Sequence, residues 1–370
     1  MVKKILGILL IVLSYSEIFA QTETPAPLDQ NPSATEKRRS TYFKVTADSI
    51  TSATTRNALV MENALQLNRI NGQGKDTHYN PTANPTYRGV GFEWGMGIRH
   101  GAGFFKSNIL VSAAVLGAGE AQNDLNKSGG ASFLAENSIT NFYYSDNKLT
   151  TARIGYYGDI LPFHNSSNSF LEKIGIRLGL EAYGNQSELT SDLNNKSGLV
   201  PFGSLPGLDF LAKRKLTYTE QTVNGVIGLN YELVFAQKHK LSLGVEHFQS
   251  VYGGGNYENK LTGLSSGPFI MPTNSKVHGE VTNKINGNRF SFGYAFSFTE
   301  SFAIKLSFGI SKAIHEVISS DVKDPPNPLS LLMGGGDSSS LLYSLASPMS
   351  ANPRSVDSRN QFGLAFEFKF

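Results

Sequence analysis

Acids and bases standing at every second position are the residues of this chain with the clearest capacity for chemistry. In several stretches they, or small residues, alternate with large apolar side chains. A period of two places alternate side chains on opposite faces of a strand, so the charged residues share the face away from the apolar ones. These positions are Glu93, Arg99, Arg153, Asp159, Lys173, Arg177, Glu181, Glu232, Glu246, Arg289, Lys305, Glu367 and Lys369.

Acids and bases that share one enclosed face have two roles open to them. They can pair with one another and plug a narrow interior, because burying either sign alone costs several kcal/mol. They can also line a water-filled channel and bias which solutes pass. We expect Glu93, Arg153, Arg177, Glu232 and Arg289 to point inward in either case, and the sequence leaves both roles open.

His247 and Ser250 come nearest to a hydrolase pair, in which a histidine activates a nucleophilic hydroxyl. Their spacing of three makes them point to opposite faces of a regular strand. His247 instead shares the face of Leu243 and Val245, which favours a place in the apolar wall or at its rim. We therefore expect no catalytic residues and no enzyme.

Metal and phosphate sites are also not expected. The histidines show no metal-ligand spacing. The glycine runs at 253–255 and 334–336 do not lead from a strand into a helix, as a phosphate-binding loop would. We interpret both runs as parts of mobile loops, and we expect no cofactor.

Amphipathic strands are the elements that must position the charged residues. After a first strand between 43 and 70, the alternation predicts strands at 86–99, 104–118, 136–160, 171–188, 210–236, 239–258, 276–298 and 301–318, and a last one at the end of the chain. The count is about ten. It becomes twelve if Asn224-Gly225 and Asn286-Gly287 are hairpin turns.

The first strand has the weakest pattern. Leu59, Met61, Leu65 and Leu67 alternate there with Val60, Glu62, Ala64 and Gln66. The stretch 56–70 contains no Gly or Pro, so a helix would fit it as well. An even number of strands requires a strand in this region.

The connections alternate between short and long along the chain. Those near 100–103, 161–170, 236–239 and 299–301 are short to moderate, whereas those near 71–85, 119–135, 189–210, 258–276 and 319–356 are long. Short turns at one end and long loops at the other are typical of barrels that cross a membrane. The 319–356 loop also carries two apolar patches, for which packing against other loops is the simplest role.

The end of the chain carries a family resemblance. Phe362, Leu364, Phe366, Phe368 and Phe370 alternate with small or charged residues. This pattern resembles the terminal strand of bacterial outer-membrane β-barrel proteins. The resemblance implies an all-β, transmembrane, antiparallel up-and-down β-barrel, and it implies that Phe366, Phe368 and Phe370 form the signal read by the barrel-insertion machinery.

The start of the chain reads as an export signal. Lys3 and Lys4 precede an apolar run from Ile5 to Leu13, and a cut is expected near Ala20. We predict a signal peptide at 1–20, a flexible periplasmic segment at 21–54 and an outer-membrane β-barrel at 55–370. The predicted location is the bacterial outer membrane.

Composition excludes several classes of protein. The chain has no cysteine, so noncovalent burial must hold it together. A mean hydropathy of −0.20 is not that of a membrane helix bundle. The net charge of only +3 argues against nucleic acid as a partner.

The leading functional prediction is a porin-like passage of small solutes through a narrow lumen of mixed charge. A surface-exposed binding or adhesion protein with a plugged barrel is the alternative, and an outer-membrane hydrolase is the third. The expected partners are outer-membrane lipid, the insertion machinery, and small solutes or a surface ligand.

Overall fold

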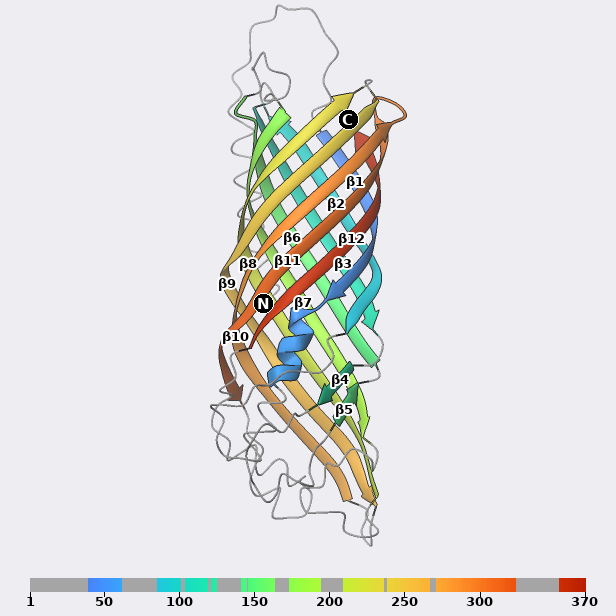
Figure 1. Cartoon of the computed structure of the whole chain (residues 1–370), viewed down its shortest axis with the longest axis vertical. Helices are drawn as coiled ribbons and strands as arrows, with labels where there is room; N and C mark the ends of the chain where they lie inside the picture. Colours follow the sequence, from blue (N-terminus) through green and yellow to red (C-terminus); the bar gives the residue numbers. More distant parts are fainter. Residues whose placement is uncertain are drawn as a thin grey trace, which may run out of the picture. The chain divides into compact units, whose positions relative to one another are not determined.

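The computed structural model describes residues 39–61, 85–100, 104–118, 121–124, 141–144, 146–163, 173–193, 209–235, 238–266, 271–323 and 353–370. Antiparallel strands close into one barrel (Figure 1). Its wall consists of β1 (Arg39–Thr51), β2 (Thr86–His100), β3 (Phe105–Ala118), β6 (Asp146–Ile160), β7 (Ile174–Leu193), β8 (Asp209–Phe235), β9 (His239–Ser266), β10 (Met271–Ser297), β11 (Phe302–Lys323) and β12 (Arg354–Lys369).

The barrel has an up-and-down order. Each of its strands pairs with the barrel strand that follows it in the chain, and β1 pairs with β12 to close the ring. Phe370 reinforces this closure, because its N–H donates to the carbonyl of Arg39 and its carbonyl accepts from the N–H of Arg39. The predicted fold, a closed barrel of ten strands, is confirmed.

The twelve-stranded alternative is wrong. Asn224 and Gly225 lie inside β8, and Asn286 and Gly287 lie inside β10, where they pair with residues of the neighbouring strands. A small separate sheet pairs β4 (Ala121–Asp124), in the loop predicted near 119–135, with β5 (Asn141–Tyr144), in the strand predicted at 136–160. The barrel strand in that stretch, β6, starts only at Asp146. No helix in the described part of the chain is long and apolar enough to cross a membrane.

The start of the barrel differs from the prediction. The first strand is β1 at Arg39–Thr51, so the barrel starts well before residue 55. Residues 53–61, which include Leu59 and Met61, form a helix, while Leu65 and Leu67 lie outside the described residues. The hydroxyl of Ser52 accepts a hydrogen bond from the N–H of Thr55, which is the geometry of a helix N-cap and explains why the strand stops there.

The two ends of the barrel differ. At one end, here called the turn end, β1 begins, β12 ends, and β8 passes to β9 within a few residues. At the opposite end, the loop end, β8, β9 and β10 extend to 27, 28 and 27 residues and project farthest in Figure 1. These extensions take up most of the loop predicted at 258–276, whereas strands cover only the two ends of the loop predicted at 189–210.

Large apolar side chains face outward along the wall. Phe92 is 67% exposed and Ile227 is 55% exposed, whereas the residues next to them in sequence, Glu93 and Val226, are buried. The same alternation continues on the other strands with Val90, Val245, Phe290, Phe292, Leu306, Phe308, Phe362, Leu364 and Phe366 outside. The predicted period of two is therefore present in the wall, and the polar face looks into the barrel.

Aromatic rings form a continuous series at the turn end of the wall. Phe235 stacks on His239, which contacts Phe296, and Phe298 contacts Phe302. Ring centroids along this series lie 4.9–5.9 Å apart. Aromatic girdles of this kind flank the apolar band of membrane barrels.

The glycines at 253–255 lie in β9 and not in a loop, so that interpretation is wrong. They lie next to the position at which the pairing register of β9 with β8 and with β10 shifts. A Cβ on Gly253 would collide with the carbonyl oxygen of Asn283, and one on Gly255 would collide with that of Thr219. Glycine is needed at these two positions because the strand backbones approach each other there.

Candidate functional site: the barrel interior

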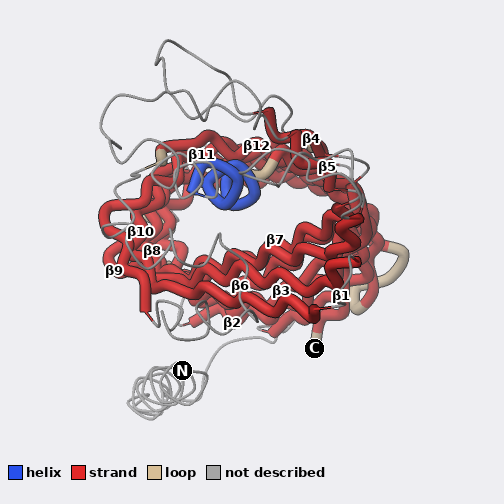
Figure 2. The backbone as a smooth tube through the Cα atoms, turned by 90° about the horizontal axis from the view of Figure 1, so that it is seen from below, coloured by secondary structure: helices blue, strands red, loops and turns tan. Residues whose placement is uncertain are grey.

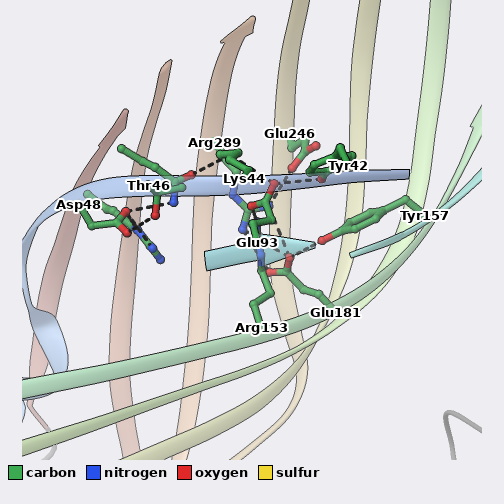
Figure 3. A network of polar contacts seen from close by, with 12 residues as sticks. Tyr42, Lys44, Thr46, Asp48, Glu93, Arg153, Tyr157, Glu181, Glu246 and Arg289 are labelled. Carbon is green, nitrogen blue, oxygen red and sulfur yellow. Dashed lines mark hydrogen bonds and ion pairs between the residues drawn. The ribbon is translucent and has the colours of Figure 1, made fainter. Parts of the chain in front are cut away.

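The middle of the interior is crossed by a network of ion pairs (Figure 3). Arg177 donates two hydrogen bonds to Asp159, at 2.7 and 3.0 Å, and a third to Glu246 at 2.7 Å. Arg289 donates to the second oxygen of Glu246 at 2.9 Å and to Glu181 at 3.3 Å. Glu246 thus joins the two arginines.

A second group of ion pairs centres on Glu93. One carboxylate oxygen of Glu93 accepts from the Tyr42 hydroxyl at 2.9 Å and from the Lys44 ammonium at 3.2 Å, and the other accepts from Arg153 at 3.3 Å. Figure 3 shows these side chains converging from β1, β2 and β6. Glu93 is therefore held by two cations, one from the neighbouring strand β1 and one from β6, which lies beyond β3 on the other side.

Amides and hydroxyls satisfy the remaining oxygens of the buried acids. Asp159 accepts from Asn108 at 2.8 Å and Asn230 at 2.9 Å. Glu181 accepts from Tyr157 at 3.0 Å and Asn224 at 3.2 Å. A buried ion pair is tolerated when additional hydrogen bonds satisfy the remaining oxygens of its acid. The network is therefore a polar layer whose buried acids are hydrogen-bonded.

An apolar layer lies next to the ion pairs. Tyr157, Val226, Phe248, Ile285 and Ala313 pack together as a buried cluster. Two arginines of the network lie on its rings: the guanidinium carbon of Arg177 is 5.3 Å from the Tyr157 ring centre, and that of Arg289 is 5.0 Å from the Phe248 ring centre. Aromatic and aliphatic side chains thus border the ion pairs on this side of the interior.

The helix at residues 53–61, here called the lumen helix, lies inside the ring of strands (Figure 2). Thr54, Asn57, Leu59 and Met61 are all fully buried. The helix follows β1 directly at its loop-end terminus, so it occupies the half of the interior nearer the loop end.

Polar contacts bind the lumen helix to the wall. The Thr54 hydroxyl donates to Glu220 at 2.6 Å, and His315 contacts the same carboxylate oxygen at 2.8 Å. The N–H of Ala53 donates to Asp357 at 3.2 Å. These three wall residues come from β8, β11 and β12, so the helix is anchored across a wide arc of the barrel.

A second set of contacts holds the first turn of the helix to the opposite side. The Thr55 hydroxyl is bonded to the Tyr87 hydroxyl at 3.0 Å and to the Ser187 hydroxyl at 2.8 Å. Asn185 donates to Thr54 at 3.1 Å. The lumen helix is therefore bound by hydrogen bonds on both sides.

Lysines gather inside the turn end. Glu232 is paired with Lys240 at 2.7 Å and lies 3.9 Å from Lys106. Their side chains keep partial exposure, 40% for Glu232 and 28% for each lysine, so water reaches them. Lys305 lies nearby on β11. This end of the interior is more open than the layers beyond it.

The predicted charged residues fall into two groups. Glu93, Arg153, Asp159, Arg177, Glu181, Glu246 and Arg289 meet in the network of ion pairs. Arg99, Glu232, Lys305 and Glu367 lie on strands near the turn end, and Lys173 stands immediately before β7. His247 is exposed on the outer face, where its Nδ1 lies 2.9 Å from Asn288.

Several interior residues were not predicted. Lys44 and Tyr42 complete the Glu93 site, and Asp48 pairs with Arg359 at 2.9 Å. The sequence does contain a pattern that indicates them, because alternation in 40–50 puts Tyr42, Lys44 and Asp48 on one face of a strand. These residues fall within the predicted flexible periplasmic segment at 21–54. Among the described residues no group of His, Cys, Asp and Glu has the arrangement of a metal site.

The fold defines the class of the protein. Ten antiparallel strands closed in chain order, apolar outside and polar within, form the architecture of bacterial outer-membrane β-barrels. No protein-family model matches the chain. No curated protein sequence matches it either.

Solved structures of outer-membrane barrels are similar to the chain over most of its length, at very low identity and low TM-score. The outer membrane protease OmpT from Escherichia coli is 8% identical over 92% of this chain and 99% of its own, with a TM-score of 0.43. The Pseudomonas putida toluene transporter TodX is 10% identical over 89% and 90%, with a TM-score of 0.34. The translocator domain of the autotransporter NalP from Neisseria meningitidis is 6% identical over 91% and 90%, with a TM-score of 0.31. At these values the likeness does not extend to function.

Proposed function

We propose that the barrel lies in the bacterial outer membrane with its turn end toward the periplasm and its loop end outside. The exposed apolar wall and the aromatic series at the turn end support this placement. A strand needs about 9–11 residues to cross the membrane, so the 27–28 residues of β8 to β10 rise well beyond the outer surface.

Within that membrane the protein acts as a gated passage for small polar solutes. The lumen helix closes the outer half of the interior, and the ion pairs constrict the middle. The observation that carries the proposal is that hydrogen bonds join the helix to Glu220, Asp357 and Ser187 of the wall, with the two carboxylates accepting from Thr54 and Ala53.

The polar character of these contacts favours a gate over a permanent filling. A hydrogen bond inside a protein contributes about 0.5–1.5 kcal/mol net, or about 1.5–3 kcal/mol when one partner is charged, because water replaces the lost partner when the contact opens. An interior meant only to be filled is more stable with apolar side chains than with buried ion pairs. A helix held by hydrogen bonds can therefore leave a polar lumen at moderate cost.

Conductance across a planar lipid bilayer tests the proposal. We expect the purified, folded protein to be closed for most of the time. A variant with residues 53–61 replaced by a Gly-Ser linker of equal length should give discrete channel steps far more often. A silent linker variant that still folds contradicts the passage, and a permanently open native protein contradicts the gate.

A surface-binding protein is the second candidate. The extensions of β8, β9 and β10 favour it, since a pore alone does not need strands of 27–28 residues. The conductance experiment separates the two candidates, because a barrel that serves only as a support for surface binding stays silent in both forms.

A further inference from the structure

A row of lysines crosses the interior near the turn end. Lys240 on β9 stands opposite Ala295 on β10, which stands opposite Lys305 on β11. Lys305 in turn stands opposite Ala365 on β12, and Ala365 stands opposite Lys44 on β1. Every second strand of this arc therefore carries a lysine, with an alanine between.

The row is compact. Neighbouring strands lie about 4.8 Å apart, so lysines on alternate strands start roughly 10 Å apart. All three point into a closed ring, where flexible side chains of this length converge. Like charges in one row repel each other, and an interior of lower dielectric strengthens that repulsion.

Carboxylates do not balance these lysines. Glu93 forms an ion pair with Lys44 but also with Arg153. Glu232 forms an ion pair with Lys240 but also lies near Lys106. Within the described part of the chain, the Lys305 ammonium makes no hydrogen bond or close ion pair, and Glu367 and Glu232 act on it only through longer-range attraction.

Small residues surround Lys305. Its side chain lies over Gly293, where an added Cβ would come within 2.8 Å of the Lys305 Cε. The Ser242 hydroxyl lies at the same glycine, and Ala295 and Ala365 flank the lysine along the row. Along the row, the neighbours of Lys305 are therefore the short side chains of Ala295 and Ala365.

We propose that the row of Lys240, Lys305 and Lys44 is a binding site for a small oxyanion of the phosphate type, entered from the turn end. Rings of lysine or arginine select anions in pores by the same electrostatic attraction. Lys305 is the central ligand, because it stands between the other two lysines and its ammonium makes no hydrogen bond or close ion pair within the described residues. The site goes beyond the proposed passage and does not need the lumen helix to move.

Calorimetric titration of the folded, detergent-solubilised full chain with inorganic phosphate tests the site. Ionic strength is held constant with chloride. We expect saturable binding that Lys305→Gln weakens by about tenfold or more, as the loss of a charged hydrogen bond predicts. Lys305→Arg should retain binding. Lys312→Gln, an exposed change on the same strand, should leave it unaltered.

A second variant keeps the test decisive if Lys305→Gln does not fold. Ala295→Asp keeps every lysine and places a carboxylate in the row, so it should abolish phosphate binding. Heat-modifiable mobility on gels verifies that each variant is folded. Absence of saturable binding, equal displacement by chloride, or native-like affinity in a folded Lys305→Gln or Ala295→Asp variant overturns the site. Such a failure leaves the passage proposal standing, because conductance is measured separately.

Discussion

The carboxylate of Asp357 accepts a hydrogen bond from the backbone N–H of Ala53 at 3.2 Å, across 304 positions of sequence. This contact joins the last strand of the barrel to the first residue of the lumen helix. It places a negative charge at the positive end of the helix dipole, where carboxylates stabilise helices. The two ends of the barrel domain thus meet at the helix inside it.

Removing this carboxylate should loosen the lumen helix. We expect Asp357→Ala to cost about 1 kcal/mol in the attachment of the helix, as the loss of a helix N-terminal partner does. Hydrogen–deuterium exchange of the amides in 53–61 measures the effect as faster exchange. Arg354→Ala, an exposed change on the same strand, is the control. Unchanged protection in Asp357→Ala would show that the contact does not hold the helix.

The ion pairs at the centre should be sensitive to truncation. Arg289→Ala leaves Glu181 and Glu246 each short of a cation in a buried layer. Breaking a buried pair in this way costs about 3–5 kcal/mol. Equilibrium unfolding in guanidinium, with the protein in lipid vesicles, measures the loss.

Lys284→Ala is the matched control for that change, since Lys284 lies on the same strand and is exposed. It should alter the free energy of unfolding by less than about 0.5 kcal/mol. If both variants unfold alike, the network does not contribute to stability as proposed.

A charged side chain on the lipid-facing part of the apolar wall should lower the free energy of unfolding. Phe292→Arg places a cation among the outward residues of β10 and is expected to cost about 2–4 kcal/mol. Thr282→Arg, also outward on β10 but in its extension toward the loop end, should cost little. Equal effects in the same unfolding assay would mean that Phe292 does not contact acyl chains.

The glycines of β9 give a steric prediction. Gly253→Ala directs a methyl group at the carbonyl oxygen of Asn283, and overpacking of this kind costs about 1–3 kcal/mol. At Gly254 the nearest atom to an added Cβ is 3.6 Å away, which is ordinary contact, so Gly254→Ala should be tolerated. A reversed order of stability would refute the close approach of β9 and β10.

Local patterns account for the parts that were predicted correctly. Phe92 lies outside and Glu93 inside because a strand turns successive side chains to opposite faces, and this rule needs no partner strand. The number of barrel strands followed from the same rule combined with the alternation of short and long connections. The strand predicted around Leu59 and Met61 is wrong, because a short apolar pattern without Gly or Pro fits a helix equally well.

The loop predicted at 319–356 shows a different limit of prediction from sequence. The predicted loop shrinks at both ends, because β11 continues to Lys323 and β12 begins at Arg354. The apolar patches that made the loop unusual lie outside the described residues. Their role stays a prediction.

The amino-acid order by itself determined which side chains face out and which face in, since the geometry of a strand is set within a few residues. It did not determine that Lys44 would share Glu93 with Arg153, or that Thr54 and His315 would meet at Glu220. Those meetings depend on the register in which distant strands pair and on the closure of the ring. Only the tertiary structure decides them, because the free energy that selects the register is summed over the whole wall.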